Sequence, residues 1–248
     1  MISLLEFLLV VLVSCLVALA IAWIVERARA HRARTPDDDR VGVKIGAAFA
    51  VYGVLLGFAV VVAQQSYADS ESAVRTEMGA VIATVNTALA LPESQGEPII
   101  EDMRKYLTAE IATWESLGEA GIKTPSLAAI RQGYVDTQAL SGSPDAAGAQ
   151  TAIFATLAAV DESRADRILL FHARFSPFMW ALLLGGGLLV IAMMSLLHFD
   201  SKFLRMSLLF AMASLIGVAL FTIWAFSQPF SGPIPISSDA LAHVLSSL

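Results

Sequence analysis

The sequence contains few of the residues that build reactive or metal-binding sites. Its 248 residues include one cysteine and four histidines. A single cysteine excludes an intrachain disulfide and any zinc cage made of cysteines. The histidines lie on separate segments without the HExxH spacing that brings two imidazoles onto one metal: His31, His172, His198 and His243. We therefore expect no catalytic residue, no metal and no cofactor, and the protein is not predicted to be an enzyme.

Charged residues are also scarce, which places the chain among membrane proteins. They make up 15% of the residues, against about 25% in soluble domains, while 56% are hydrophobic and the mean hydropathy is +0.68. The formal net charge is -6, and no basic block with interleaved aromatic residues is present. Nucleic acid is therefore excluded as a partner, and the lipid bilayer is the first partner to expect.

Four apolar runs are long enough to cross the hydrocarbon layer, which takes about 20 helical residues. They are Ile2–Val25, Ile45–Ala63, Pro177–Leu197 and Phe203–Ser227. None carries an Asp, Glu, Arg or His at mid-depth, and Glu6 lies near the outer end of the first run. Ion-coupled transporters and proton pumps keep such residues in the membrane. This absence argues against both classes.

The second run continues into a polar segment without an interruption. Proline and glycine pairs are absent until Pro92, although the chain becomes charged after Ala63. This pattern predicts one long helix that leaves the membrane and begins a water-facing domain.

Residues 64–176 form a soluble insert with 15 acidic and 8 basic residues, a net charge of -7. Breaks at proline and glycine separate four expected helices: Gln64–Leu91, Glu97–Leu117, Pro125–Leu140 and Pro144–Phe175. Apolar residues recur every three or four positions in the second of them, and no strand-like alternation of useful length occurs. The insert is predicted to be a helical bundle.

Basic residues predict the orientation of the chain. The loop 26–44 holds six of the sixteen basic residues, and the connection between the last two runs adds Lys202 and Arg205. Such loops stay cytoplasmic, so the N-terminus, the insert and the C-terminus are expected outside the cytoplasm. The expected domains are 1–63 with two spans, the insert 64–176, 177–227 with two further spans, and a Pro/Gly tail 228–248 with a short amphipathic helix. The predicted fold is thus an all-α integral membrane protein with four transmembrane helices and an extracytoplasmic helical bundle continuous with spans two and three.

Several short motifs carry a family resemblance over nearly the whole chain. They are Gly57-Phe58 with Gln65-x-Tyr67, Glu77, Arg104-x-Tyr106-Leu107, Asp166-Arg167-Ile168-Leu169, Pro177-Phe178-Met179-Trp180 and Pro229-Phe230-Ser231-Gly232-Pro233-Ile234. On these motifs the chain resembles the bestrophin-like domain family of integral membrane proteins. The family name implies similarity to bestrophins, which are oligomeric anion channels with a hydrophobic neck. The resemblance therefore implies a homo-oligomeric channel in the cell membrane that passes small anions.

The second run supplies the candidate pore residues. One helical face carries Val51, Leu55, Phe58, Val62 and Gln65, and Gln64 and Tyr67 follow at the expected outer mouth. In a symmetric oligomer such a face lines a hydrophobic constriction that gates by dewetting. An apolar face of this kind also suits contact with lipid or with another helix. The competing hypothesis for the whole protein is a non-conducting sensor or scaffold whose insert binds a partner.

Glycines mark the candidate helix-packing positions, since small residues let helix backbones approach closely in lipid. They are Gly46, Gly53, Gly57, Gly185, Gly186 and Gly187. The glycines of the second run suit packing within the chain and packing between subunits equally. The triple glycine favours close helix packing over an interrupted helix.

Several charged residues in and beside the insert are expected to form structural salt bridges or solvated faces in preference to a ligand site. They are Glu77, Arg104, Asp166, Arg167 and Arg174.

Overall fold

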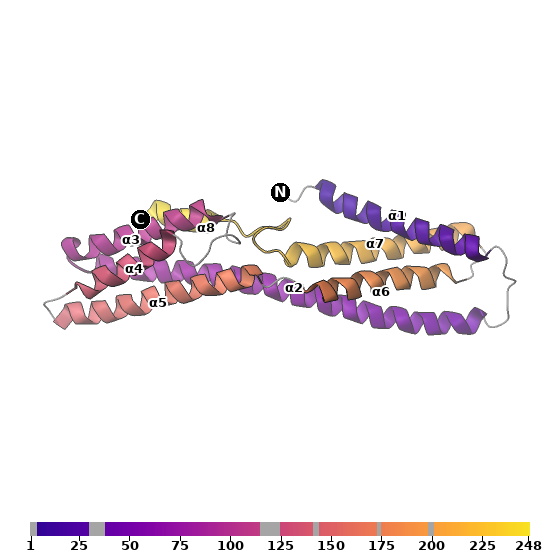
Figure 1. Cartoon of the computed structure of the whole chain (residues 1–248), viewed down its shortest axis with the longest axis horizontal. Coiled ribbons are helices and arrows are strands. Elements are labelled where there is room, and N and C mark those ends of the chain that lie inside the picture. Colours follow the sequence, from indigo (N-terminus) through magenta and orange to yellow (C-terminus); the bar gives the residue numbers. More distant parts are fainter. Residues whose placement is uncertain (1–3, 30–37, 115–124, 141–143, 173–174, 198–200) are drawn as a thin grey trace. The chain divides into compact units, whose positions relative to one another are not determined.

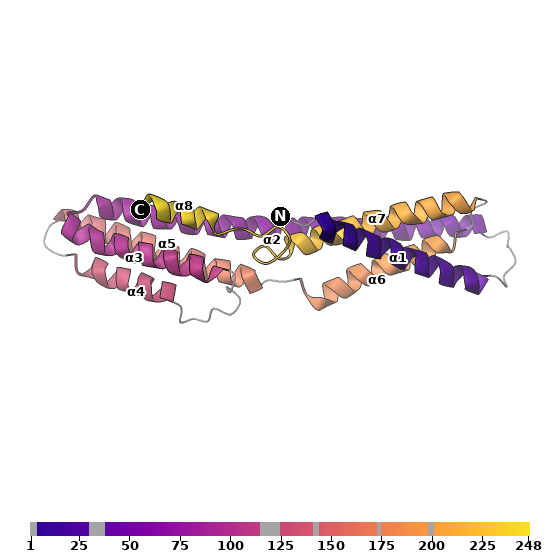
Figure 2. The ribbon, with the colours of Figure 1, turned by 90° about the horizontal axis from the view of Figure 1, so that it is seen from above.

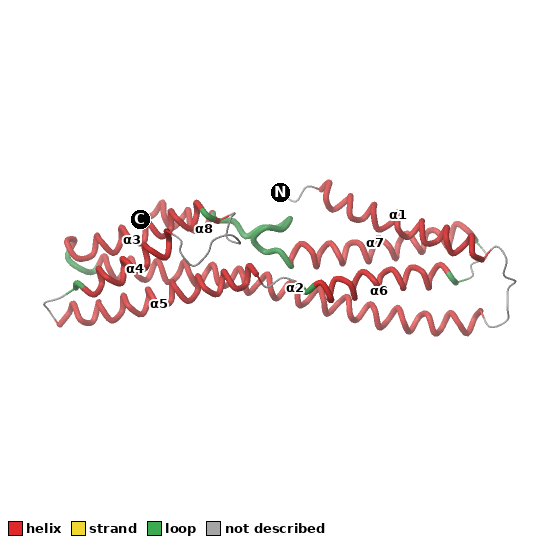
Figure 3. Tube along the Cα trace, viewed as in Figure 1, coloured by secondary structure: helices red, strands yellow, loops and turns green. Residues whose placement is uncertain are grey.

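The computed structural model describes residues 4–29, 38–114, 125–140, 144–172, 175–197 and 201–248. Every regular element in these ranges is a helix, which confirms the all-α prediction (Figure 3). The helices are α1 Leu4–Arg29, α2 Asp38–Leu89, α3 Glu93–Ala112, α4 Pro125–Gln138, α5 Pro144–His172, α6 Pro177–Ser195, α7 Lys202–Phe226 and α8 Asp239–Ser247.

Helix α2 is the long helix expected from the sequence. It runs without a break for 52 residues and contains both the second apolar run and the first helix of the insert. It begins at Asp38, while α1 continues to Arg29, so the expected loop 26–44 is helical at both of its ends.

The chain divides into two compact units, each considered by itself. Unit 1 comprises Met1–Ser66, Phe175–Gln228 and Gly232–Ile234, and unit 2 comprises Tyr67–Arg174, Pro229–Ser231 and Pro235–Leu248. In unit 1, α1 packs against α6 and α7, which also pack on each other (Figure 1). In unit 2, α4 packs against both α3 and α5, and α8 packs against α3 (Figure 2).

Within the described ranges, three helices are long and apolar enough to cross a membrane. They are the part of α2 from Ile45 to Leu89, α6 and α7. A shorter apolar stretch, Leu8–Ile24, lies in α1, so a first span there stays a prediction. Cys15 is buried in the core of unit 1, with its Sγ 3.5 Å from the hydroxyl of Ser214.

The start of α3 differs from the expectation. α3 begins at Glu93, four residues earlier than predicted, and Pro98 lies inside it. The turn before it needs Gly96, since a Cβ there would lie 2.2 Å from the carbonyl oxygen of Ala88.

The insert is helically continuous with the second span, but the expected continuity with the third span is wrong. Helix α5 ends at His172, and α6 begins at Pro177 after an extended Ser176. The proline disfavours helical geometry at the residue before it. The Ser176 hydroxyl then caps the new helix by accepting a hydrogen bond from the Met179 amide.

Candidate pore-lining face and buried charge network

The predicted pore-lining side chains lie on a face of α2 that unit 1 leaves uncovered. Val51, Leu55, Phe58 and Val62 are exposed by 63%, 43%, 67% and 56%, and Gln65 is exposed as well. A contiguous apolar face of this kind marks contact with lipid or with another protein surface. Of the two residues expected at the outer mouth, Gln64 is exposed and Tyr67 is half-buried.

The glycines of α2 face open space in the single chain. A Cβ added at Gly46, Gly53 or Gly57 would meet nothing within 4 Å. Among the described residues, therefore, no other helix of this chain uses these positions for close packing. These three positions are therefore open to lipid or to a second copy of the chain.

Unlike the glycines of α2, two glycines of the triple glycine in α6 contact another helix, because they accommodate the side chain of Tyr52 on α2. A Cβ at Gly186 would lie 2.6 Å from the Tyr52 ring, and one at Gly187 would lie 2.9 Å from its hydroxyl oxygen. That hydroxyl donates a hydrogen bond of 2.9 Å to the carbonyl oxygen of Leu183. Gly185, in contrast, has open space beside it, and α6 is not interrupted at the glycines.

Unit 2 contains a buried ion network that joins three helices. Arg167 of α5 is fully buried and donates from Nε to Glu77 of α2 over 2.6 Å. Its Nη2 donates to Glu77 over 3.1 Å and to Glu110 of α3 over 2.5 Å. Arg164, one turn earlier on α5, donates from Nε to Glu110 over 2.7 Å. Two carboxylates thus balance two guanidinium groups in a dry environment, as buried charges require.

Aromatic residues enclose this network. The Tyr106 hydroxyl donates to Glu77 over 2.5 Å, and the Trp114 ring lies 4.9 Å from the Arg167 guanidinium carbon, a cation–π contact. Burial and then the charge of Glu77 raise the pKa of Tyr106 well above 10.0. Burial also acts to raise the pKa of Glu110, but the charge of Arg167 and hydrogen bonds from Ser126 and both arginines lower it overall. These shifts favour a neutral Tyr106 that donates its hydrogen bond and an ionised Glu110 that pairs with the arginines. The network therefore acts as a structural joint between the helices.

Sequence reasoning found part of this network. It placed Glu77 and Arg167 among five charged residues expected in structural salt bridges or on solvated faces, without pairing them. It missed the roles of Glu110, Arg164 and Tyr106. One available signal was the position of Glu110, which follows the buried Met103 and Tyr106 along one face of α3. An acidic residue in an apolar stripe needs a buried partner.

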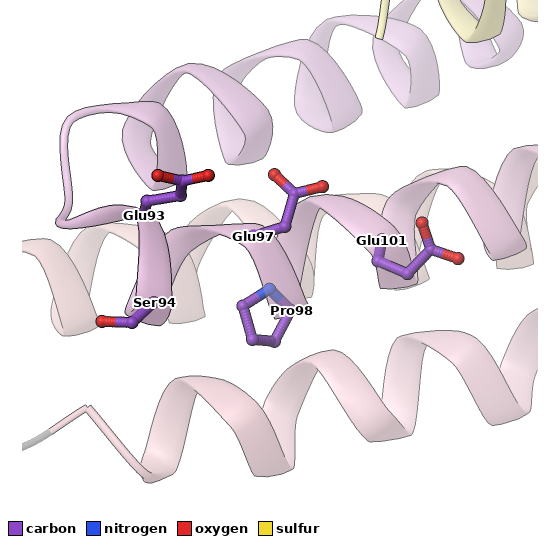
Figure 4. A pocket seen from close by; sticks show the side chains of 5 residues that line it. All are labelled: Glu93, Ser94, Glu97, Pro98 and Glu101. Carbon is purple, nitrogen blue, oxygen red and sulfur yellow. The ribbon is translucent and has the colours of Figure 1, made fainter.

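The other predicted partners lie elsewhere. Arg104 pairs with Glu97 at 2.9 Å and Glu101 at 3.4 Å, and it donates to the carbonyl oxygen of the C-terminal Leu248. Asp166 is exposed, and Arg174 lies outside the described residues. Glu97 and Glu101 also line a shallow hollow on α3 with Glu93, Ser94 and Pro98 (Figure 4). Because Arg104 compensates two of its three carboxylates, this hollow is a solvated helix surface and gives no sign of a ligand.

Comparison with known proteins identifies the family of the chain and solved structures that share its fold. The sequence profile of the bestrophin-like domain matches residues 12–241. No curated protein was found to match the sequence.

Among solved structures, a membrane protein variant superposes with a TM-score of 0.74 at 9% identity, covering 96% of this chain and 95% of the other. Two variants of a bacterial bestrophin homologue from Klebsiella pneumoniae superpose with TM-scores of 0.71 and 0.67, at 10% and 9% identity. They cover 98% of this chain and 98% and 97% of theirs. At such low identity these similarities establish a shared fold.

Proposed function

Since the chain belongs to the bestrophin-like domain family, we propose that it assembles with copies of itself into a membrane channel whose pore is lined by α2. The lining side chains are Val51, Leu55, Phe58, Val62 and Gln65, with Gln64 and Tyr67 at the outer mouth. In this proposal α1 completes a set of four spans. The basic residues around 26–44 lie in the cytoplasm, and the insert and both termini lie outside it.

The uncovered apolar face of α2 is the observation that carries the proposal. Four large apolar side chains at successive helical turns are exposed in the single chain. On the opposite side of α2, the glycines also face open space among the described residues. When such faces surround a symmetry axis, they form a hydrophobic neck that opens and closes by wetting. The similarity in fold to a bestrophin homologue supports this arrangement.

Passive permeation is the mechanism that suits these residues. The four apolar runs carry no ionisable group at mid-depth that could couple an ion to a conformational cycle. We propose anions as the permeating ions because of the family. The net charge of -7 on the insert acts in the opposite direction, since a negative vestibule concentrates cations. The choice between anions and cations therefore needs a measurement separate from the test of whether the protein conducts.

The test uses the full chain, purified and reconstituted into planar bilayers. We expect voltage-driven current that changes several-fold in Phe58→Ala. The matched control is Phe210→Ala on α7, which removes a phenylalanine of similar exposure, 58% against 67%, and which should leave the current unchanged. The reversal potential under a salt gradient then identifies the permeating charge.

Three results would contradict the proposal. Monomeric particles leave no room for a pore between copies. An intact oligomer without current favours the sensor or scaffold, in which the insert binds a partner. A current that neither Phe58→Ala nor Phe210→Ala changes would show that the Phe58 face of α2 does not line the pore.

A further inference from the structure

A buried carboxyl group in unit 2 lacks the partners that a carboxylate needs. Asp102 lies on α3, and only 2% of its surface is exposed. Its Oδ1 is 3.7 Å from the Lys105 ammonium group, and its Oδ2 has no hydrogen-bond donor among the described residues. Burying a charged oxygen without a donor is costly.

A second carboxyl group faces it from the neighbouring helix. Asp136 of α4 lies close enough to Asp102 to interact with it both by charge and by hydrogen bonding. The Gln132 amide, also on α4, donates to Asp136 Oδ1 over 2.9 Å. Because an ionised carboxylate only accepts hydrogen bonds, the two groups can bond to each other only when one of them carries a proton.

We propose that Asp102 and Asp136 form a proton-binding site that fastens α3 to α4. With the proton bound, the O–H of one carboxyl donates to the other, and the orphaned oxygen of Asp102 gains its partner. Without the proton, two negative charges face each other at the contact between the helices. The site is separate from the proposed pore and does not depend on it.

The surrounding charges support this assignment. Burial, followed by the hydrogen bond and the charge of Asp136, raises the pKa of Asp102 from 3.8 to about 6, while Lys105 lowers it. Asp239 and His243 on α8, which packs on α3, and Asp161 and Glu162 on α5, which packs on α4, are exposed. None of these four is among the groups that shift this pKa.

The sign of the pH effect follows from proton linkage. Between 3.8 and about 6 the folded chain holds a proton that the unfolded chain has released. Stability from this site therefore falls as the pH rises through that window. Conversely, acidification below about 6 tightens the contact between α3 and α4.

The test is thermal unfolding of the full chain in detergent across this window, for Asp102→Asn, Asp136→Asn and the exposed control Asp161→Asn. An asparagine amide donates a hydrogen bond permanently and replaces the proton. We expect the melting temperature of both site variants, relative to the wild type, to rise with pH. The Asp161→Asn difference should stay constant.

Infrared spectroscopy reads the proton directly, even where a variant folds poorly. We expect a protonated-carboxyl C=O band to grow in the wild type as the pH falls through about 6 and to be missing in Asp102→Asn. Equal pH dependence in wild type and Asp102→Asn, with no difference in that band, would overturn the proposal. Stabilisation of the wild type by Ca²⁺ above that pH, lost in Asp102→Asn, would also overturn it, because the pair would then hold a cation.

Discussion

The two units of the chain treat apolar and charged side chains in opposite ways. Unit 1 leaves large apolar residues uncovered on its helices, such as Phe58, Phe178 and Phe203 at 67%, 75% and 82% exposure. Among the described residues, every buried charged side chain lies in unit 2: Glu77, Asp102, Glu110, Arg164 and Arg167.

The difference suits the environments that we propose for the two units, lipid for unit 1 and water for unit 2. In lipid, exposed apolar side chains cost nothing, whereas a charge is expensive wherever it lies. In water, an apolar core must be covered, and a few charges can enter it when they are paired and hydrogen-bonded. Helix α2 belongs to both units, so one element meets both requirements along its length.

The largest effect should come from breaking the ion network of unit 2. Replacing Arg167 with methionine leaves Glu77 and Glu110 buried without their shared partner, which should destabilise unit 2 by about 3–5 kcal/mol. Denaturant unfolding followed by circular dichroism measures the loss. Arg131→Met, an exposed arginine on α4, is the control and should stay within about 0.5 kcal/mol. A loss below about 1 kcal/mol for Arg167→Met would show that the network is not a structural joint.

An intermediate effect is expected from steric crowding in unit 1. Gly186→Ala places a methyl group 2.6 Å from the Tyr52 ring, and overpacking of this kind costs about 1–3 kcal/mol. Gly185→Ala adds the same methyl group one residue earlier in open space and should be nearly neutral. Melting temperatures in detergent compare the two. Equal changes in the two variants would mean that the contact with Tyr52 does not determine the result, because the gain in helix propensity from glycine to alanine is the same at both positions.

The smallest effect should come from an ion pair on the surface of unit 2. Arg75 and Glu71 are 2.5 Å apart, with side chains 73% and 45% exposed. Solvated helical pairs at this spacing contribute about 0.3–0.5 kcal/mol, so Arg75→Ala should shift the unfolding midpoint only slightly, and added salt should remove the difference. A loss of stability in Arg75→Ala as large as that in Arg167→Met would show that buried and exposed ion pairs of unit 2 do not differ in their contribution.

Local patterns predicted the helices well and the contacts between them less well. The unbroken α2 follows from the absence of proline and glycine pairs. Glu77 and Arg167 were among the charged residues expected in salt bridges or on solvated faces, but they were not paired with each other. Glu110 was missed, because its partners come from α5, more than fifty positions later in the chain. The expected helical continuity with the third span failed at Pro177, where the chain restarts with its own cap.

By itself, the sequence determined the all-helical class, the apolar runs, the long helix and the family. These depend on composition, on spacing and on motifs that can be read along the chain. Only the tertiary structure decided which side chains meet. It brought Arg167 to a glutamate 90 positions away, Tyr52 onto two glycines of α6, and Asp102 beside Asp136. The physical reason is that helix formation depends on near neighbours, whereas the pairing of buried charges depends on how separate helices pack.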